Sequence, residues 1–65
     1  MKTTDQYTFQ NHEAVWIAEG IETAKSQEEF IAAWQHIYDT GLYQHLQGWY
    51  GRRIQDMIDM GYLEP

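Results

Sequence analysis

The chain has 65 residues, contains no cysteine and carries 10 acidic against 4 basic side chains, for a formal net charge of −6. This length predicts one domain of low stability, because so short a chain buries only about 60% of the surface that its unfolded state exposes. The lack of cysteine excludes disulfides and thiolate metal sites. The acidic charge disfavours nucleic acid and anionic membranes, and we expect neither as a partner.

Residues 1–10 are mostly polar, with Tyr7 and Phe9 alternating around Thr8. They predict an extended or disordered N-terminal arm, followed by a single helical domain over residues 11–65. The sequence contains no apolar run that could span a bilayer and begins with no secretory leader. We therefore expect a cytoplasmic protein.

The first helix is expected to begin with Asn11 as its cap and to end near Thr23, since Gly20 weakens it. One apolar face is spaced at helical intervals through residues Ala14, Ile17, Ala18 and Ile21. Trp16 lies off this face.

The second helix has the clearest signals in the chain. Ser26 and Glu29 have the spacing of a capping box, in which each side chain binds a free amide of the first turn. Helical spacing then joins the apolar residues Phe30, Ile31, Trp34, Ile37 and Tyr38. Asp39, Thr40 and Gly41 should end this helix, with Gly41 in the left-handed conformation.

A third helix is predicted from about Leu42 to Met60, with Gly61 just beyond its end. Its core face holds Leu42, Leu46, Trp49, Tyr50, Met57 and Met60, widened by Tyr43, Ile54 and Ile58. The short linker makes helices two and three antiparallel neighbours. The predicted fold is therefore all-α, a small three-helix domain in which helices two and three form an antiparallel hairpin.

Two glycines stand out inside the predicted third helix. At helical spacing, one side of this predicted helix holds Gln44, Gly48, Gly51 and Gln55. These residues would form an uncharged strip with few side chains. Each glycine costs about 1 kcal/mol relative to alanine in a helix interior, so a small domain needs a reason for both. Three interpretations stay open: close approach of another backbone, from helix one or from a partner; a break in the helix near Gly48; or a cost that is simply tolerated.

The neighbouring arginines differ in their predicted surroundings. Arg52 points outward, toward solvent or a partner, whereas Arg53 falls inside the apolar arc. Arg53 then needs either an acidic partner or a path along which its stem reaches water. Asp39, Glu19 and Glu22 are the candidate acids.

The sequence contains no arrangement of residues that is typical of a catalytic site. His12, His36 and His45 have no metal-ligand spacing, and Ser26, the only serine, is better used as a helix cap. Neighbouring carboxylates such as Glu28 and Glu29 point apart on a helix. We predict no catalytic residue, no metal and no cofactor, and thus a protein that is not an enzyme.

The block from Trp34 to Arg52 reads WQHIYDTGLYQHLQGWYGR. It resembles a family of small uncharacterised proteins of tailed bacteriophages, with the core W-Q-x-(L/I)-x-D-T-G-L-x-x-x-L-Q-G-W-(F/Y)-G-R. The matching residues are Trp34, Gln35, Ile37, Asp39, Thr40, Gly41, Leu42, Leu46, Gln47, Gly48, Trp49, Tyr50, Gly51 and Arg52. The resemblance implies phage origin and a host-cell cytoplasm, and it implies no assigned activity.

Two functional hypotheses follow. The first is an acidic interaction protein that binds and modulates a host protein, such as a defence effector or a transcription or replication enzyme; a DNA-mimic form of it would use the acidic residues. The alternative is a structural protein that self-associates as a homodimer or assembly subunit. In both, the predicted partner-binding residues are Gln44, Gly48, Trp49, Gly51, Arg52 and Gln55. A helix-turn-helix using Arg52 and Arg53 is disfavoured by the net charge of −6.

Overall fold

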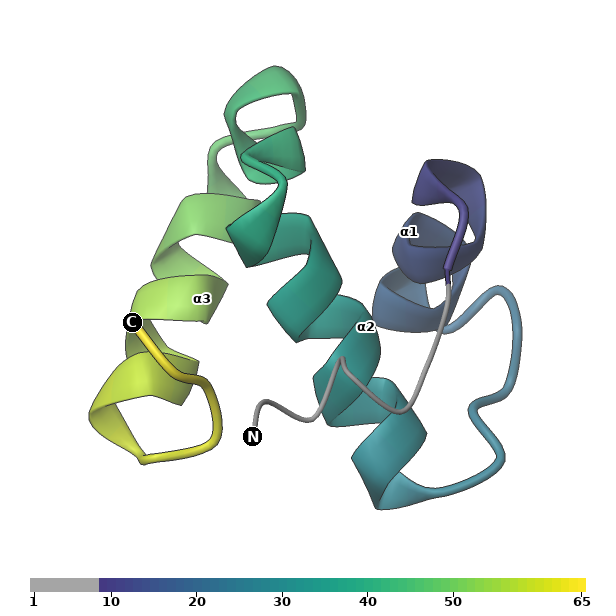
Figure 1. The fold of residues 1–65 in the computed structure, drawn as a ribbon. Coiled ribbons are helices and arrows are strands. Elements are labelled where there is room, and N and C mark those ends of the chain that lie inside the picture. Colours follow the sequence, from purple (N-terminus) through teal and green to yellow (C-terminus); the bar gives the residue numbers. More distant parts are fainter. Residues whose placement is uncertain (1–8) are drawn as a thin grey trace.

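The structure is a computed structural model that describes residues 9–65, and all regular secondary structure in that range is helical. The elements are α1 (Asn11–Glu19), α2 (Gln27–Asp39), the short 3-10 helix η2 (Leu42–His45) and α3 (Trp49–Asp59). In Figure 1, α2 lies between α1 and α3, and the chain turns through η2 so that α3 runs back in the opposite sense. The predicted all-α fold with three main helices is confirmed.

The predicted N-terminal arm, residues 1–10, lies outside the described residues except at its end. Phe9 is half-buried against the core and packs its ring edge-on to His36, with the ring centroids 6.0 Å apart. Gln10 adopts the extended conformation of a helix cap, and its N–H donates to the Glu13 carboxylate at 3.0 Å. The predicted cap Asn11 is therefore wrong by one residue. Asn11 instead pairs its side-chain oxygen with His36 Nε2 at 3.0 Å.

The first helix also ends earlier than expected. α1 stops at Glu19 because Gly20 takes a left-handed conformation, with φ 78°, and its N–H donates to the Ile17 carbonyl at 3.1 Å. The expected end near Thr23 is wrong. Ile21 consequently lies beyond the helix and is 70% exposed, whereas Ala14 and Ile17 of the predicted apolar face are buried.

The second helix begins and ends at the predicted residues. The Ser26 hydroxyl accepts the Glu29 N–H at 3.1 Å, which is the first half of the capping box. The Glu29 carboxylate accepts the Lys25 N–H at 2.9 Å, so the return bond reaches one residue further back than predicted. At the other end Gly41 is left-handed, with φ 74°.

The third helix is not continuous, and the prediction of one helix from Leu42 to Met60 is wrong. The chain forms η2, becomes extended at Leu46 (φ −108°, ψ 179°), and starts α3 only after Gly48. This break agrees with the second interpretation of the glycine pair. It lets Leu42, Tyr43 and Leu46 all pack against the core while the chain changes direction into α3.

The core joins all three helices to the C-terminal segment. Its buried apolar members are Ala14, Ile17, Ala33, Trp34, Ile37, Tyr50, Ile54, Met57 and Leu63. The backbone of α2 packs closely against α1. Between α2 and α3 large rings fill the space: Trp34 meets Tyr50 at a centroid distance of 5.6 Å and Trp49 at 6.1 Å. Rings this large keep the two helix backbones apart.

The segment after α3 folds back onto α2. Gly61 is left-handed (φ 86°), as expected for a glycine that follows a helix, and Leu63 is buried. The fully buried Gln35 donates its side-chain amide to the Glu64 carbonyl at 3.0 Å and accepts the Glu64 N–H at 2.9 Å. The same amide nitrogen also donates to Asp39 at 3.0 Å, so every polar group of Gln35 has a partner.

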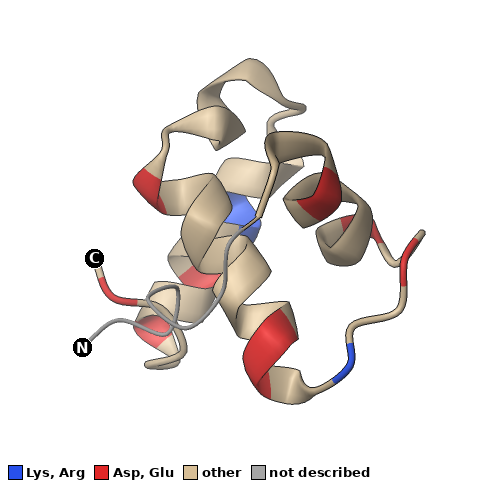
Figure 2. Cartoon of the chain, turned by 45° about the vertical axis from the view of Figure 1, so that its right-hand side comes forward, with Lys and Arg blue, Asp and Glu red and all other residues tan. Residues whose placement is uncertain are grey.

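Charged residues are distributed unevenly by sign. In Figure 2, acidic segments lie on all three main helices and near the C-terminus. The basic residues within 9–65 are Lys25, in the α1–α2 connection, and the adjacent pair Arg52 and Arg53 on α3. No helix in this range is both long and apolar enough to cross a membrane.

Candidate functional site

Two glycines of the predicted partner-binding set lie at the start of α3. Neither Gly48 nor Gly51 has a positive φ, in contrast to Gly20, Gly41 and Gly61. Among residues 9–65, a Cβ atom built on Gly48 would have no neighbour within 4 Å, and one on Gly51 would meet only the Tyr43 ring, at 3.9 Å. The chain itself therefore requires glycine at neither position, and the backbone of α1 does not approach them.

Trp49 is the aromatic member of the set. Its indole is 38% exposed, and its Nε1–H donates to the Gln47 side-chain oxygen at 3.2 Å. One part of the ring stacks on Tyr50, with centroids 4.0 Å apart, and it meets buried Trp34 edge-on. Trp49 is thus anchored by the core and still offers an apolar surface to solvent.

The remaining members lie on two different elements. Gly48, Arg52 and Gln55 follow helical spacing along α3 and share its solvent side, where Gln55 donates to Asp59 at 3.1 Å. Gln44 belongs to η2 instead, so the four-residue helical strip predicted from Gln44 to Gln55 does not form. Tyr43 links the two parts.

Tyr43 makes that link with both ends of its side chain. Its hydroxyl accepts a weak hydrogen bond from the Gln44 amide at 3.5 Å, and its ring faces Gly51. A set of residues on two elements, rather than one helical strip, is what a partner would meet. We call the group of Gly48, Trp49, Gly51 and Arg52 the α3 N-terminal surface; Gly51 is half-buried and the other three residues are exposed.

A buried tyrosine ties α3 to α1. The Tyr50 hydroxyl donates to the Glu19 carboxylate across the helix pair. Burial of the ring, followed by the hydrogen bond to Glu19 and its negative charge, raises the pKa of Tyr50 well above its usual range. All three causes favour the protonated phenol. At neutral pH the Tyr50 hydroxyl therefore keeps its proton and acts as a hydrogen-bond donor to Glu19.

The histidines are used in structural contacts. His36 pairs with Asn11, as described above. His12 packs edge-on against Trp16, with centroids 4.8 Å apart. Across residues 9–65, no group of three or more histidine, aspartate or glutamate side chains is placed to hold a metal ion.

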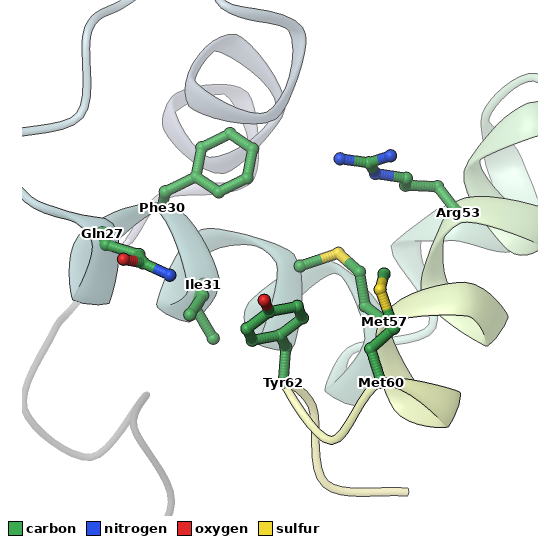
Figure 3. A pocket seen from close by; sticks show the side chains of 7 residues that line it. All are labelled: Gln27, Phe30, Ile31, Arg53, Met57, Met60 and Tyr62. Carbon is green, nitrogen blue, oxygen red and sulfur yellow. The ribbon is translucent and has the colours of Figure 1, made fainter.

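The structure also contains an open hollow that no pattern in the sequence predicts. It has a volume of about 210 Å³ and lies between the beginning of α2 and the end of α3 (Figure 3). Its lining consists of Gln27, Phe30 and Ile31 from α2, Arg53, Met57 and Met60 from α3 and its end, and Tyr62. The Arg53 guanidinium extends over this hollow toward Phe30.

The environment of Arg53 decides between the two predictions made for it. Its candidate acid Glu19 is bound to Tyr50, and Arg53 forms no ion pair with any residue of 9–65. The side chain is exposed while its stem lies beside Met57. This arrangement agrees with the interpretation that the stem covers apolar surface and carries the charge to water.

Comparison of the chain with protein-family models, with curated proteins and with solved structures finds no match.

Proposed function

We propose that the chain is a small protein-binding domain of phage origin that acts in the cytoplasm of the infected cell. It binds a host protein, such as a defence effector or an enzyme of transcription or replication, and inhibits it by contact. The proposal assigns this contact to the α3 N-terminal surface, with Gln44 and Gln55 at its edges. It includes no catalytic step, no cofactor and no membrane or nucleic-acid partner.

The glycine pair is the observation that carries the proposal. Neither Gly48 nor Gly51 has a positive φ, and among residues 9–65 a Cβ at Gly48 would meet open space while one at Gly51 would make an ordinary contact with the Tyr43 ring. Gly51 lies within α3, where glycine costs about 1 kcal/mol relative to alanine, whereas Gly48 is the N-cap of α3, a position that tolerates glycine. A partner whose backbone comes close to the start of α3 gives Gly51 a use that folding does not, and the bare backbone at Gly48 extends the same approach surface.

Trp49 and Arg52 support the same surface. Tryptophan and arginine are enriched among the residues that contribute most to protein–protein binding. Trp49 is already held by Tyr50 and Gln47, so binding would immobilise it at small entropic cost. Arg52 is exposed and supplies a positive charge on an acidic protein.

The test compares three tagged proteins in pull-downs from host lysate: the unmodified chain, Gly48→Leu combined with Arg52→Glu, and Lys25→Glu. Lys25→Glu is the matched control, because it reverses an exposed charge away from α3. We expect one host protein to be recovered by the unmodified chain and by Lys25→Glu, and lost with the double variant. Purified host protein should then be inhibited by the chain. Equal recovery by all three proteins would overturn the assignment to this surface.

Self-association is the second candidate function, and the exposed apolar side chains favour it. Trp16, Ile21, Met60 and Tyr62 are 44%, 70%, 58% and 47% exposed, which is a large apolar surface for so short a chain. A homodimer or assembly subunit would bury some of it. Sedimentation equilibrium over a wide concentration range tests this candidate, and a monomer at the highest concentration rejects it.

A further inference from the structure

The hollow between α2 and α3 combines an apolar floor with a polar rim. Phe30, Ile31 and Met57 are buried or half-buried and form the floor. Figure 3 shows the Arg53 guanidinium, the Gln27 amide and the Tyr62 hydroxyl arranged around them. An apolar cavity with a few polar groups at its edge is the usual form of a binding site.

The charge of this site is positive, in contrast to the rest of the chain. Among residues 9–65, Arg53 is the only charged residue that lines the hollow, and the lining includes no carboxylate. A guanidinium offers parallel N–H donors that fit the two oxygens of a carboxylate. No acid from residues 9–65 lines this position, so the guanidinium is available to a carboxylate of another molecule.

Size indicates what kind of molecule carries that carboxylate. Sites for drug-sized molecules have volumes of roughly 300–1,000 Å³, and this hollow has about 210 Å³. It is also open rather than enclosed. These properties suit one apolar side chain of a peptide that continues along the surface. Met57 and Met60 can adapt their shape to such a side chain, because methionine is unbranched and flexible.

We propose that the hollow docks an acidic peptide segment of another protein, inserting one apolar side chain against Phe30, Ile31 and Met57 while a neighbouring carboxylate pairs with Arg53. This site is separate from the α3 N-terminal surface. The proposal for the hollow therefore does not depend on the function proposed above. The two adjacent arginines serve different sites: Arg52 belongs to the α3 N-terminal surface, and Arg53 lines the hollow.

The experiment is an NMR titration of the full chain labelled at the methionine methyls, with capped dipeptides as probes. The three probes are leucyl-glutamate, leucyl-glutamine and glycyl-glutamate, each acetylated and amidated. We expect leucyl-glutamate to shift the methyl signals of Met57 and Met60 saturably. Leucyl-glutamine should bind about threefold more weakly or worse, because it lacks the charge. Glycyl-glutamate should bind more weakly still, because it lacks the apolar side chain.

Matched variants assign the charge to its residue. Arg53→Gln should weaken leucyl-glutamate binding by about threefold or more and remove the difference between the glutamate and glutamine probes. Arg52→Gln changes the neighbouring exposed arginine and should leave both affinities unchanged. Because both side chains are exposed, both variants should keep the helical circular dichroism of the unmodified chain.

Four results would overturn the proposal. The methionine signals could fail to move with leucyl-glutamate, or move equally with leucyl-glutamine. Arg52→Gln could weaken binding as much as Arg53→Gln, which would indicate a general charge effect. The Met57 and Met60 signals could also depend on protein concentration without any probe, which would mean that a second copy of the chain fills the hollow.

Discussion

Gln35 binds both backbone polar groups of Glu64, through hydrogen bonds of 3.0 and 2.9 Å. The side-chain amide of Gln35 thus provides the hydrogen bonds that a neighbouring strand or a helix turn would normally provide to the backbone N–H and C=O of Glu64. The pair joins α2 to the C-terminal segment, and Leu63 is buried beside it. Tyr62, which forms one wall of the hollow, is held in place by the same segment.

Replacing Gln35 should destabilise the chain and release the tail. In Gln35→Leu the Glu64 N–H and C=O lose their partners, and we expect the free energy of unfolding to fall by about 1–3 kcal/mol. Urea denaturation followed at 222 nm measures this change, and amide exchange at Leu63 and Glu64 should accelerate. Gln55→Leu is the control, since Gln55 is exposed and bonds only to Asp59. An equal loss in both variants would contradict the role given to the Gln35 pair.

Gly51→Ala should make the protein more stable. The added methyl group would meet only the Tyr43 ring, at 3.9 Å, and α3 would gain helix propensity of about 0.5–1 kcal/mol. Gly61→Ala should do the opposite by about 1–2 kcal/mol, because its φ of 86° strains any side chain. Thermal unfolding of both variants checks these signs. A destabilised Gly51→Ala would mean that folding itself needs this glycine, and the argument for a partner surface would fail.

Tyr50 predicts a specific dependence of stability on alkaline pH. The folded state raises the pKa of Tyr50 above its unfolded value of about 10, so folding favours the protonated phenol. This contribution is fully present below about pH 10 and is lost as the pH rises above it. The unfolding free energy of the unmodified chain minus that of Tyr50→Phe should be constant up to about pH 9.5. It should then decrease by up to about 1.4 kcal/mol per pH unit.

Urea titrations of both proteins between pH 7 and 11 measure this difference. Lysines and the other tyrosines titrate in both proteins, so they largely cancel from it. Tyr50→Phe should also be less stable at pH 7, by about 1 kcal/mol, because it loses the hydrogen bond to Glu19. A difference that stays flat through pH 11 would show that the phenol is not favoured by the fold.

Ser26 should be the most sensitive helix cap. Ser26→Ala removes the acceptor of the Glu29 N–H and should cost about 1 kcal/mol, whereas Ser26→Asp keeps an acceptor and should preserve stability. Chemical denaturation of the two variants side by side gives the answer. If both lose stability equally, the hydroxyl contributes through something other than capping.

The residues that could be predicted from the sequence carry local signals. Ser26 with Glu29, Gly41 and Gly61 each act within a few residues of the chain, and each lies where its type implies. The apolar spacing of α2 likewise placed Trp34 and Ile37 in the core. Gly20 carries the same kind of signal, since its left-handed conformation ends α1.

The break before α3 and the role of Gln35 lie beyond such signals. Leu42 and Leu46 keep the spacing of residues on one face of a helix, although the chain between them forms the 3-10 turn η2. The apolar pattern of the sequence therefore continues through a region in which the helix itself is interrupted. Gln35 bonds to backbone groups of a residue 29 positions away. Every residue has such backbone groups, so the sequence does not indicate which of them Gln35 binds. The hollow depends on how far the rings of Trp34 and Tyr50 separate α2 from α3, which only the packed structure fixes.

The packing of Trp34, Trp49 and Tyr50 also gives the protein an optical signature. Trp34 is fully buried, Trp49 lies partly in solvent, and the rings meet at 6.1 Å and 4.0 Å. Aromatic rings held in fixed asymmetric contact produce near-ultraviolet circular dichroism, which disappears when side-chain packing loosens even if helices remain. Because Trp49 belongs to the α3 N-terminal surface, a partner that covers it would change this spectrum, and the chain can report its own binding without a label.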